Sequence, residues 1–233
     1  MFLKKSTSPK QITKRDKTIN RIRRYLFLIL FFLLIVYLVL KVIYTGGRFT
    51  ITLDRAGDAD ANLAIYENKG STSYKRTLSA ETLEYMTNIS VKWIPQNIND
   101  EAEGGHNGDN YIAYTFYIEN RGPAIINYWY EVFIDDVVKN VDEAIRVMIF
   151  INDEKTIYAK ANRTTGQPEQ ETKAFYSNES IALEKRANFN PGDVDKCTIV
   201  IWVEGDDPDC IDDLIGGEMK MHMVISEEYI KQD

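Results

Sequence analysis

Carboxylates crowd one short stretch of the sequence. Six occur in the ten residues from 204 to 213: Glu204, Asp206, Asp207, Asp209, Asp212 and Asp213. Calcium takes roughly six to eight oxygen ligands, which makes Glu204, Asp206, Asp207 and Asp209 weak candidates for a metal site. Their spacing is not that of an EF-hand, and the alternative is a solvated loop in which Asp209 or a neighbour caps a short helical turn over 210–214. The sequence favours the solvated loop and assigns no metal.

One cysteine, Cys197, precedes this stretch, and a second, Cys210, lies within it. If 196–204 is one strand, the residues that follow give the chain room to fold back toward Cys197. A disulfide closing a ring of this size would stabilise the fold by ~3 kcal/mol in the chain-entropy description, and disulfides persist outside the cytoplasm. The alternative is two separate thiols, one of them buried in the strand. The disulfide is the favoured prediction.

The residue types and their spacing give little support for a catalytic function. The two histidines, His106 and His222, lie 116 positions apart, and neither has a metal-ligand spacing to a second His, Cys or carboxylate. There is no nucleophile elbow and no phosphate-binding glycine-rich loop. The sequence therefore predicts no catalytic residue and no cofactor. The closely spaced acidic pairs are interpreted as surface charge: Glu101 with Glu103, and Asp135 with Asp136.

Aromatic residues gather in two neighbouring predicted strands. These residues are Tyr111, Tyr114, Phe116, Tyr117, Tyr128, Trp129, Tyr130 and Phe133. We interpret them chiefly as core and ordinary sheet-face residues. The alternative is a face that contacts carbohydrate or protein, because Tyr and Trp are enriched in interfaces.

A long apolar segment lies near the N-terminus, before all the residues discussed above. The run from Tyr25 to Leu40 carries no charge and continues past Lys41 to Tyr44, which gives 20 residues. At about 1.5 Å per residue, a helix of this length crosses the ~30 Å hydrocarbon layer of a membrane. We therefore predict a transmembrane helix over residues 25–44.

Charge predicts the orientation of this span. Residues 1–24 carry nine Lys or Arg and one acid, a balance of +8, and form a basic cytoplasmic tail under the positive-inside rule. This tail is expected to be disordered on the membrane surface. Residues 45–233 hold 18 Lys or Arg and 34 Asp or Glu, a balance of −16. An acidic domain without a positive patch argues against nucleic-acid binding.

A cleaved signal peptide is the competing interpretation of the apolar segment. Thr45-Gly46-Gly47 would supply a small-residue exit. The uncharged run is nevertheless longer than the usual apolar region of a signal peptide, and bulky Tyr44 precedes the exit. A retained anchor is favoured, which predicts a single-pass plasma-membrane protein with its C-terminal domain outside the cell.

Alternation of apolar and polar residues dominates residues 45–233 and predicts a mainly β domain. Helix is expected only as short turns, near 139–144 and 79–86. Asn152-Asp153-Glu154 is typical of a hairpin and Asn190-Pro191-Gly192-Asp193 of a turn. The predicted strands are 49–53, 89–93, 111–118, 125–134, 146–151, 155–161, 196–204 and the segment after Gly216-Gly217, with weaker candidates at 174–176 and 180–183. Strands separated by turns, without long helices, indicate an antiparallel, jelly-roll-like β-sandwich.

Several segments resemble exported β-sandwich proteins of Gram-positive bacteria related to the TasA/camelysin group. The resemblance covers roughly residues 48–226. It implies a jelly-roll-like sandwich, and some members build fibres by donating an N-terminal strand, which here would be residues 48–54. A chain tethered through residues 25–44 cannot readily free that strand, which favours an anchored surface role. The segments that carry the resemblance are Phe49-Thr-Ile-Thr, Asn62-Leu-Ala-Ile-Tyr66, Tyr114-Thr-Phe-Tyr-Ile-Glu-Asn-Arg-Gly122, Asn190-Pro-Gly-Asp193 and Thr198-Ile-Val-Ile-Trp-Val-Glu-Gly205.

The leading hypothesis is a non-enzymatic cell-surface protein, held in the membrane by residues 25–44, whose ectodomain binds other envelope or matrix proteins. The second is an accessory or ligand-sensing ectodomain of an envelope machine, such as a conjugation or secretion complex. A hydrolase with an unrecognised site is the third.

Overall fold

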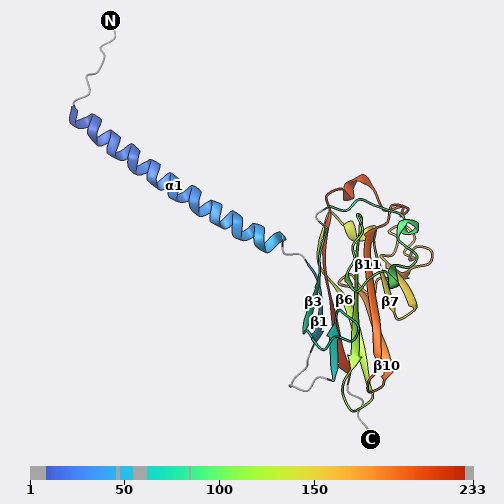
Figure 1. The fold of residues 1–233 in the computed structure, drawn as a ribbon. Coiled ribbons are helices and arrows are strands. Elements are labelled where there is room, and N and C mark those ends of the chain that lie inside the picture. Colours follow the sequence, from blue (N-terminus) through green and yellow to red (C-terminus); the bar gives the residue numbers. More distant parts are fainter. Residues whose placement is uncertain (1–8, 46–47, 55–61, 84, 229–233) are drawn as a thin grey trace. The chain divides into compact units, whose positions relative to one another are not determined.

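The computed structural model describes residues 9–45, 48–54, 62–83 and 85–228 (Figure 1). The chain forms two compact units, Met1–Gly46 and Gly47–Asp233. The first is built on one long helix and the second on two β-sheets.

The helix α1 runs from Pro9 to Thr45. Within it, Ile19–Val39 is long and apolar enough to cross a membrane, with a mean hydropathy of 2.3. The expectation of a disordered tail is wrong for residues 9–24, because the helix already includes them. Proline is well suited to the first helical position, and Lys, Arg and Gln are good helix formers, so the basic segment extends a helix that the apolar span nucleates.

The second unit is mainly β, as predicted. Sheet A has the strand order β10-β6-β12-β1-β3, and sheet B has the order β2-β5-β11-β7-β8-β9, with β4 paired to β5. The strands of sheet A are β10 (Ser180–Phe189), β6 (Ile126–Val138), β12 (Glu218–Glu228), β1 (Phe49–Asp54) and β3 (Thr77–Ala80). Those of sheet B are β2 (Leu63–Tyr66), β4 (Gly104–Gly105), β5 (Tyr111–Asn120), β11 (Val194–Val203), β7 (Ile145–Ile151), β8 (Glu154–Ala159) and β9 (Lys173–Ala174).

Alternating side chains build the core of this unit. In β12, Met221, Met223 and Ile225 are buried, while His222 lies on the other face, as the period of two predicts. They join one hydrophobic cluster to which strands of both sheets contribute, including β1, β6, β5 and β11. Burying this apolar face is what holds the sheets as layers.

A second, smaller cluster explains why β5 and β11 are apolar on both faces. Ile89, Ile94 and Ile98 pack against Val200 and Trp202, on the side of sheet B away from the main core. The predicted strand over 89–93 is wrong. The segment contributes a single bridge between Ile89 and Glu204, and then turns into a 3-10 helix, η1 (Val91–Trp93). The hydroxyl of Ser90 accepts from the Lys92 backbone N–H, and this local bond competes with a strand ladder.

The first strand after the helix lies inside its own sheet. β1 pairs in parallel with β12, from Thr50 opposite His222 to Asp54 opposite Ser226, and antiparallel with β3. It covers residues 49–54 of the segment that the family resemblance implies as a donor strand. The predicted helical turn near 79–86 is wrong, because Thr77–Ala80 forms β3 with Leu78 and Ala80 facing the core.

Three other local predictions are confirmed. A 3-10 helix, η3 (Val141–Glu143), lies within the range predicted to be helical. β7 and β8 form the predicted hairpin, and Asn152 between them has a φ of 54°. Gly192 occupies the left-handed position of the predicted turn, with a φ of 82°. That turn connects β10 of sheet A to β11 of sheet B.

Candidate functional site

The acidic loop, residues 204–213, leaves the end of β11 and lies beside the segment that precedes η1. The Gly205 backbone N–H donates to the Ile89 carbonyl oxygen at 2.9 Å, and the Ser90 hydroxyl donates to Asp206 Oδ2 at 2.7 Å. Asn88 Nδ2 lies 3.5 Å from the sulfur of Cys210. Two segments more than 100 positions apart are thereby joined into one surface. We call residues 88–94 and 204–217 together the loop surface.

Glu204 is the inner support of this surface. Its Oε2 accepts from the indole N–H of Trp202 and from the Val91 backbone N–H, each at 3.0 Å. Its Oε1 accepts from the Asp206 backbone N–H at 3.1 Å. The residue is 7% exposed. A buried carboxylate with this many donors holds its loop in place, because each bond is charge-assisted.

Asp207 ties the loop to the middle of sheet B. Arg146 of β7 donates through Nη2 to Asp207 Oδ2, and the two side chains are 4% and 1% exposed. Asp207 Oδ1 accepts from the Asp209 backbone N–H at 2.7 Å. This pair is fully desolvated, so the loss of one member would leave the other charged and buried.

The four carboxylates considered as metal ligands lie in one loop but serve separate partners. Glu204 and Asp207 are engaged as described, Asp206 accepts from Ser90, and Asp209 Oδ2 accepts from the Arg163 backbone N–H at 3.4 Å. Among the residues that the structure describes, no group of three or more His, Cys, Asp or Glu side chains is placed to hold a metal ion. The arrangement resembles a hydrogen-bonded loop more than a cation cage.

A second charged cluster adjoins the loop and was not found from the sequence. Lys160 Nζ lies 2.5 Å from Asp142 Oδ2 and 2.8 Å from Glu143 Oε1, and Arg163 Nε lies 3.1 Å from the same Glu143 oxygen. Burial by itself would lower the pKa of Lys160, but its bonds to the two carboxylates outweigh that effect and raise it. Asp142 Oδ1 and Glu143 Oε2 are buried and have no hydrogen-bond partner among the described residues. The Glu204 backbone N–H donates to the Ala144 carbonyl oxygen, which joins this cluster to the loop.

The predicted disulfide between Cys197 and Cys210 is wrong. Both thiols are free; Cys197 is fully buried in the main core and Cys210 lies beside Asn88. Cys197 is near the start of β11, whereas Cys210 belongs to the loop after its end. The seven residues from Cys197 to Val203 span roughly 20 Å in a strand, and a disulfide needs Cα atoms within about 7 Å. The loop is held at the end of β11 by its contacts with Arg146 and Ser90, so it does not fold back along the strand as the sequence interpretation assumed.

Large apolar side chains project from the loop surface into solvent. Trp93 is 77% exposed, Ile211 51% and Ile215 69%. Ile211 and Ile215 flank a 3-10 helix, η4 (Asp212–Leu214), which holds them on one short turn. Single exposed apolar residues are ordinary, but several on a fixed surface are typical of interaction sites.

The histidines make structural contacts. His106 lies with its ring nitrogens 3.0 Å from the Gly104 carbonyl oxygen and 3.3 Å from that of Ile98. His222 lies 2.8 Å from Asp135 and stacks on Phe133 at 4.9 Å. The contact with Asp135 is a hydrogen bond on the face of sheet A.

Most of the aromatic cluster is core. Tyr114, Phe116, Tyr117, Tyr128 and Tyr130 are buried, as the leading interpretation expects. Tyr111, Trp129 and Phe133 are partly exposed. The indole N–H of Trp129 donates to Glu228 at 3.3 Å, and Lys185 lies over its ring at 5.5 Å.

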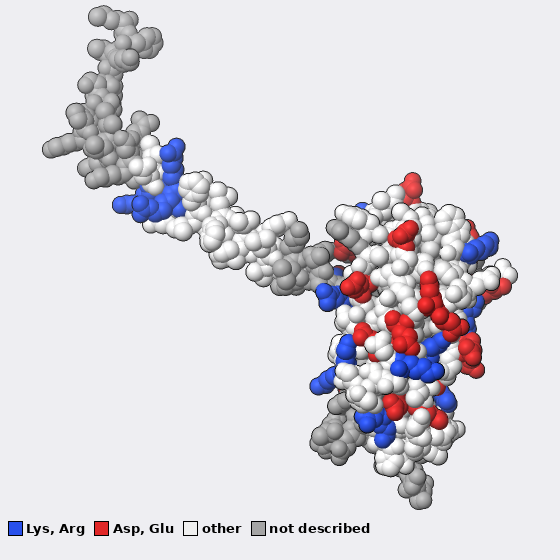
Figure 2. Space-filling view, in the orientation of Figure 1, with Lys and Arg blue, Asp and Glu red and all other residues white. Residues whose placement is uncertain are grey.

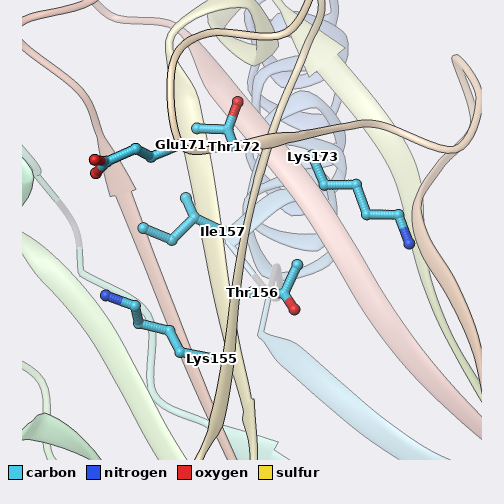
Figure 3. Close-up of a pocket in the computed structure, with 6 residues that line it drawn as sticks. All are labelled: Lys155, Thr156, Ile157, Glu171, Thr172 and Lys173. Carbon is cyan, nitrogen blue, oxygen red and sulfur yellow. The ribbon is translucent and has the colours of Figure 1, made fainter.

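A hollow beside β8 offers a poor small-molecule site. It is lined by Lys155, Thr156, Ile157, Glu171, Thr172 and Lys173 (Figure 3). Ligand pockets are mostly apolar with a few converging polar groups. Here Figure 3 shows the two lysines pointing away from each other, and Lys173 is already paired with Glu184. The loop surface is therefore the stronger candidate.

Comparison with known proteins identifies no relative. No protein-family model matches the chain, and neither does any curated protein. Among solved structures, a β-glucosidase from Kluyveromyces marxianus in complex with glucose aligns with 77% of this chain and 17% of its own length, at 14% identity and a TM-score of 0.26. A similarity of that size carries no functional argument.

Proposed function

We propose that this chain is a membrane-anchored cell-surface protein whose β-sandwich binds other envelope or matrix proteins without catalysing a reaction. The helix α1 serves as the anchor, with the basic residues 1–24 in the cytoplasm and residues 45–233 outside. The observation that carries the binding role is the loop surface, where Trp93, Ile211 and Ile215 are exposed on a base fixed by the buried pair Arg146–Asp207. Exposed apolar anchors on a rigid base are typical of binding sites.

The charges support the orientation. The +8 balance of residues 1–24 lies directly before the span, and the −16 balance of residues 45–233 lies after it. Figure 2 shows many acidic side chains on the visible face of the sandwich. Such a domain stays soluble and repels anionic surfaces, which suits a domain that projects from a membrane.

Two measurements on intact cells test this function. Protease added outside should remove the sandwich and spare the tail, and a photo-crosslinking residue in place of Ile211 should form adducts with envelope or matrix proteins. The same residue in place of Tyr176, which is 64% exposed outside the loop surface, is the matched control and should form none. Protection of the sandwich, or equal adducts at both positions, contradicts the proposal. A mature protein that begins after Gly47 would assign α1 to a cleaved signal instead.

A role inside an envelope machine is the second candidate. The helix continues for ten residues before Ile19, where the membrane-length segment begins. A helical cytoplasmic extension suits contact with a partner protein better than a bare topology signal does. Replacing residues 1–18 by an unrelated basic sequence distinguishes the roles. A simple anchor tolerates the exchange, whereas a machine component loses its partner.

A further inference from the structure

The exposed apolar side chains of the loop surface are directed outward by the local backbone. Ile94 and Leu214, their neighbours in sequence, are 6% and 9% exposed and anchor the two segments. The Leu214 backbone N–H donates to the Ile211 carbonyl oxygen at 3.0 Å, and that of Ile215 donates to Asp212 at 3.1 Å. This turn leaves Ile211 and Ile215 at its two ends, facing solvent. Ile94 and Leu214 are thus buried and hold the two segments in place, while the apolar area of Trp93, Ile211 and Ile215 stays accessible to a partner.

Acidic residues lie next to these apolar side chains: Asp212 and Asp213 separate Ile211 from Ile215, and Asp206 binds Ser90, three positions before Trp93. Asp206, Asp212 and Asp213 are exposed and Asp209 is half-buried, whereas Lys92 is the cation contributed by residues 88–94 and 204–217. Lys139, on the neighbouring strand end, donates to the Ile215 carbonyl oxygen at 2.6 Å. The nearby cations Arg146, Lys160 and Arg163 are paired with Asp207, Asp142 and Glu143. The carboxylates of Asp206, Asp209, Asp212 and Asp213 outnumber Lys92 and Lys139, so the loop surface carries a net negative charge.

We propose that the occupant of the loop surface is a positively charged protein segment that carries apolar side chains among its lysines or arginines. This inference rests on the binding function proposed above and specifies its partner. Apolar side chains of the segment would cover Trp93, Ile211 and Ile215, and its cations would meet the surrounding carboxylates. An anionic polymer would be repelled by the same carboxylates, and a neutral sugar would leave their charge unmatched.

The test uses the full chain in nanodiscs of a neutral lipid and labelled synthetic peptides as probes. A peptide of alternating lysine and leucine should bind, and its lysine–serine and glutamate–leucine counterparts should bind at least about tenfold more weakly, a difference of roughly 1.4 kcal/mol. Empty nanodiscs measure adsorption to lipid. Charges at the rim of an interface mainly increase the association rate, and salt screens them. Raised salt should therefore weaken the lysine–leucine complex.

Matched variants locate the binding. Trp93→Ser with Ile211→Ser should weaken the lysine–leucine complex at least about tenfold, whereas Tyr176→Ser with Ile125→Ser, at apolar residues 64% and 47% exposed elsewhere, should not. For charge, Asp212→Asn with Asp213→Asn should weaken it, and Asp135→Asn with Asp136→Asn should not. Circular dichroism confirms that each variant is folded.

Any of the following results overturns the inference. Equal weakening by the Asp135 and Asp136 variant means that only net charge attracts the peptide, and equal weakening by the Tyr176 and Ile125 variant means that its apolar contacts are not confined to the loop surface. Equal binding of all three peptides means that the surface has no such preference. If the peptide does not bind but crosslinks at Ile211 persist in cells, the partner chemistry is wrong and the binding function stands. If the crosslinks are missing as well, both proposals fail.

Discussion

Arg146 in the middle of sheet B donates to the carboxylate of Asp207, 61 positions later, and both side chains are almost fully buried. This pair is the deepest attachment of the acidic loop to the sandwich. It divides the six carboxylates of the loop into structural and solvent-facing ones. Asp207 belongs to the first kind, and Asp206, which is exposed and accepts from the Ser90 hydroxyl, belongs to the second.

Asp207→Ala should destabilise the sandwich by about 3–5 kcal/mol, because it leaves the Arg146 guanidinium charged, buried and unpaired. Asp206→Ala at the neighbouring exposed position is the control and should cost at most about 1 kcal/mol. Urea unfolding of the full chain in detergent, followed by tryptophan fluorescence, measures both. Similar losses for the two variants would show that the buried pair has no special weight.

The free thiols predict unequal labelling. In the folded protein a thiol reagent should modify Cys210 and spare Cys197, which is fully buried, and burial raises the pKa of both thiols. After denaturation without a reductant, both should react. Mass spectrometry counts the labels. A denatured, unreduced protein that takes no label would demonstrate the disulfide that the structure does not form.

Alkaline pH should unfold the sandwich cooperatively. Burial, followed by the bond to Glu103, raises the pKa of Tyr117 to about 12, and burial also raises the pKa of Tyr114, Tyr128 and Tyr158. An unfolded tyrosine ionises near pH 10. The stability from these neutral phenols is therefore complete below about pH 10 and is lost as the pH rises through 12.

Tyrosinate absorbance and circular dichroism, recorded together in a pH titration, check this expectation. The tyrosinate signal of the buried phenols should appear together with the loss of β-structure. A Tyr117→Phe variant removes one ionising group and should unfold at a slightly higher pH. Gradual ionisation of all tyrosines with the β-signal intact would contradict it.

Calcium should act on the acidic loop only as a salt. A bound ion at 100 times its dissociation constant would add ~2.7 kcal/mol, or roughly 5–10 °C in Tm for a domain of this size. Because Glu204 and Asp207 already serve protein donors, we expect millimolar calcium to raise the Tm no more than sodium at matched ionic strength. A calcium-specific rise that Asp206→Asn with Asp209→Asn abolishes would identify a metal site after all.

The sequence by itself determined the features that follow from a local repeat of apolar and polar residues. The uncharged run from Tyr25 to Leu40 specifies a membrane-length helix, and the alternation through Met219–Ile225 specifies which side of β12 faces the core. The side-chain direction in a helix or strand repeats with a fixed period, so these features need no knowledge of distant residues. The acidic loop was visible because its carboxylates are clustered in the sequence, which also needs no knowledge of distant residues.

Only the tertiary structure determined which residues that are distant in sequence contact one another. Asp206 and Asp207 are identical in type and adjacent in sequence, yet only Asp207 meets Arg146 and is buried. Ile89 and its neighbours alternate like a strand, yet they cover sheet B as a loop with one bridge to Glu204, just after β11. The separation of Cys197 from Cys210 follows from the extended strand between them. Each outcome depends on long-range pairing, whose free energy outweighs local preference and leaves no periodic trace in the sequence.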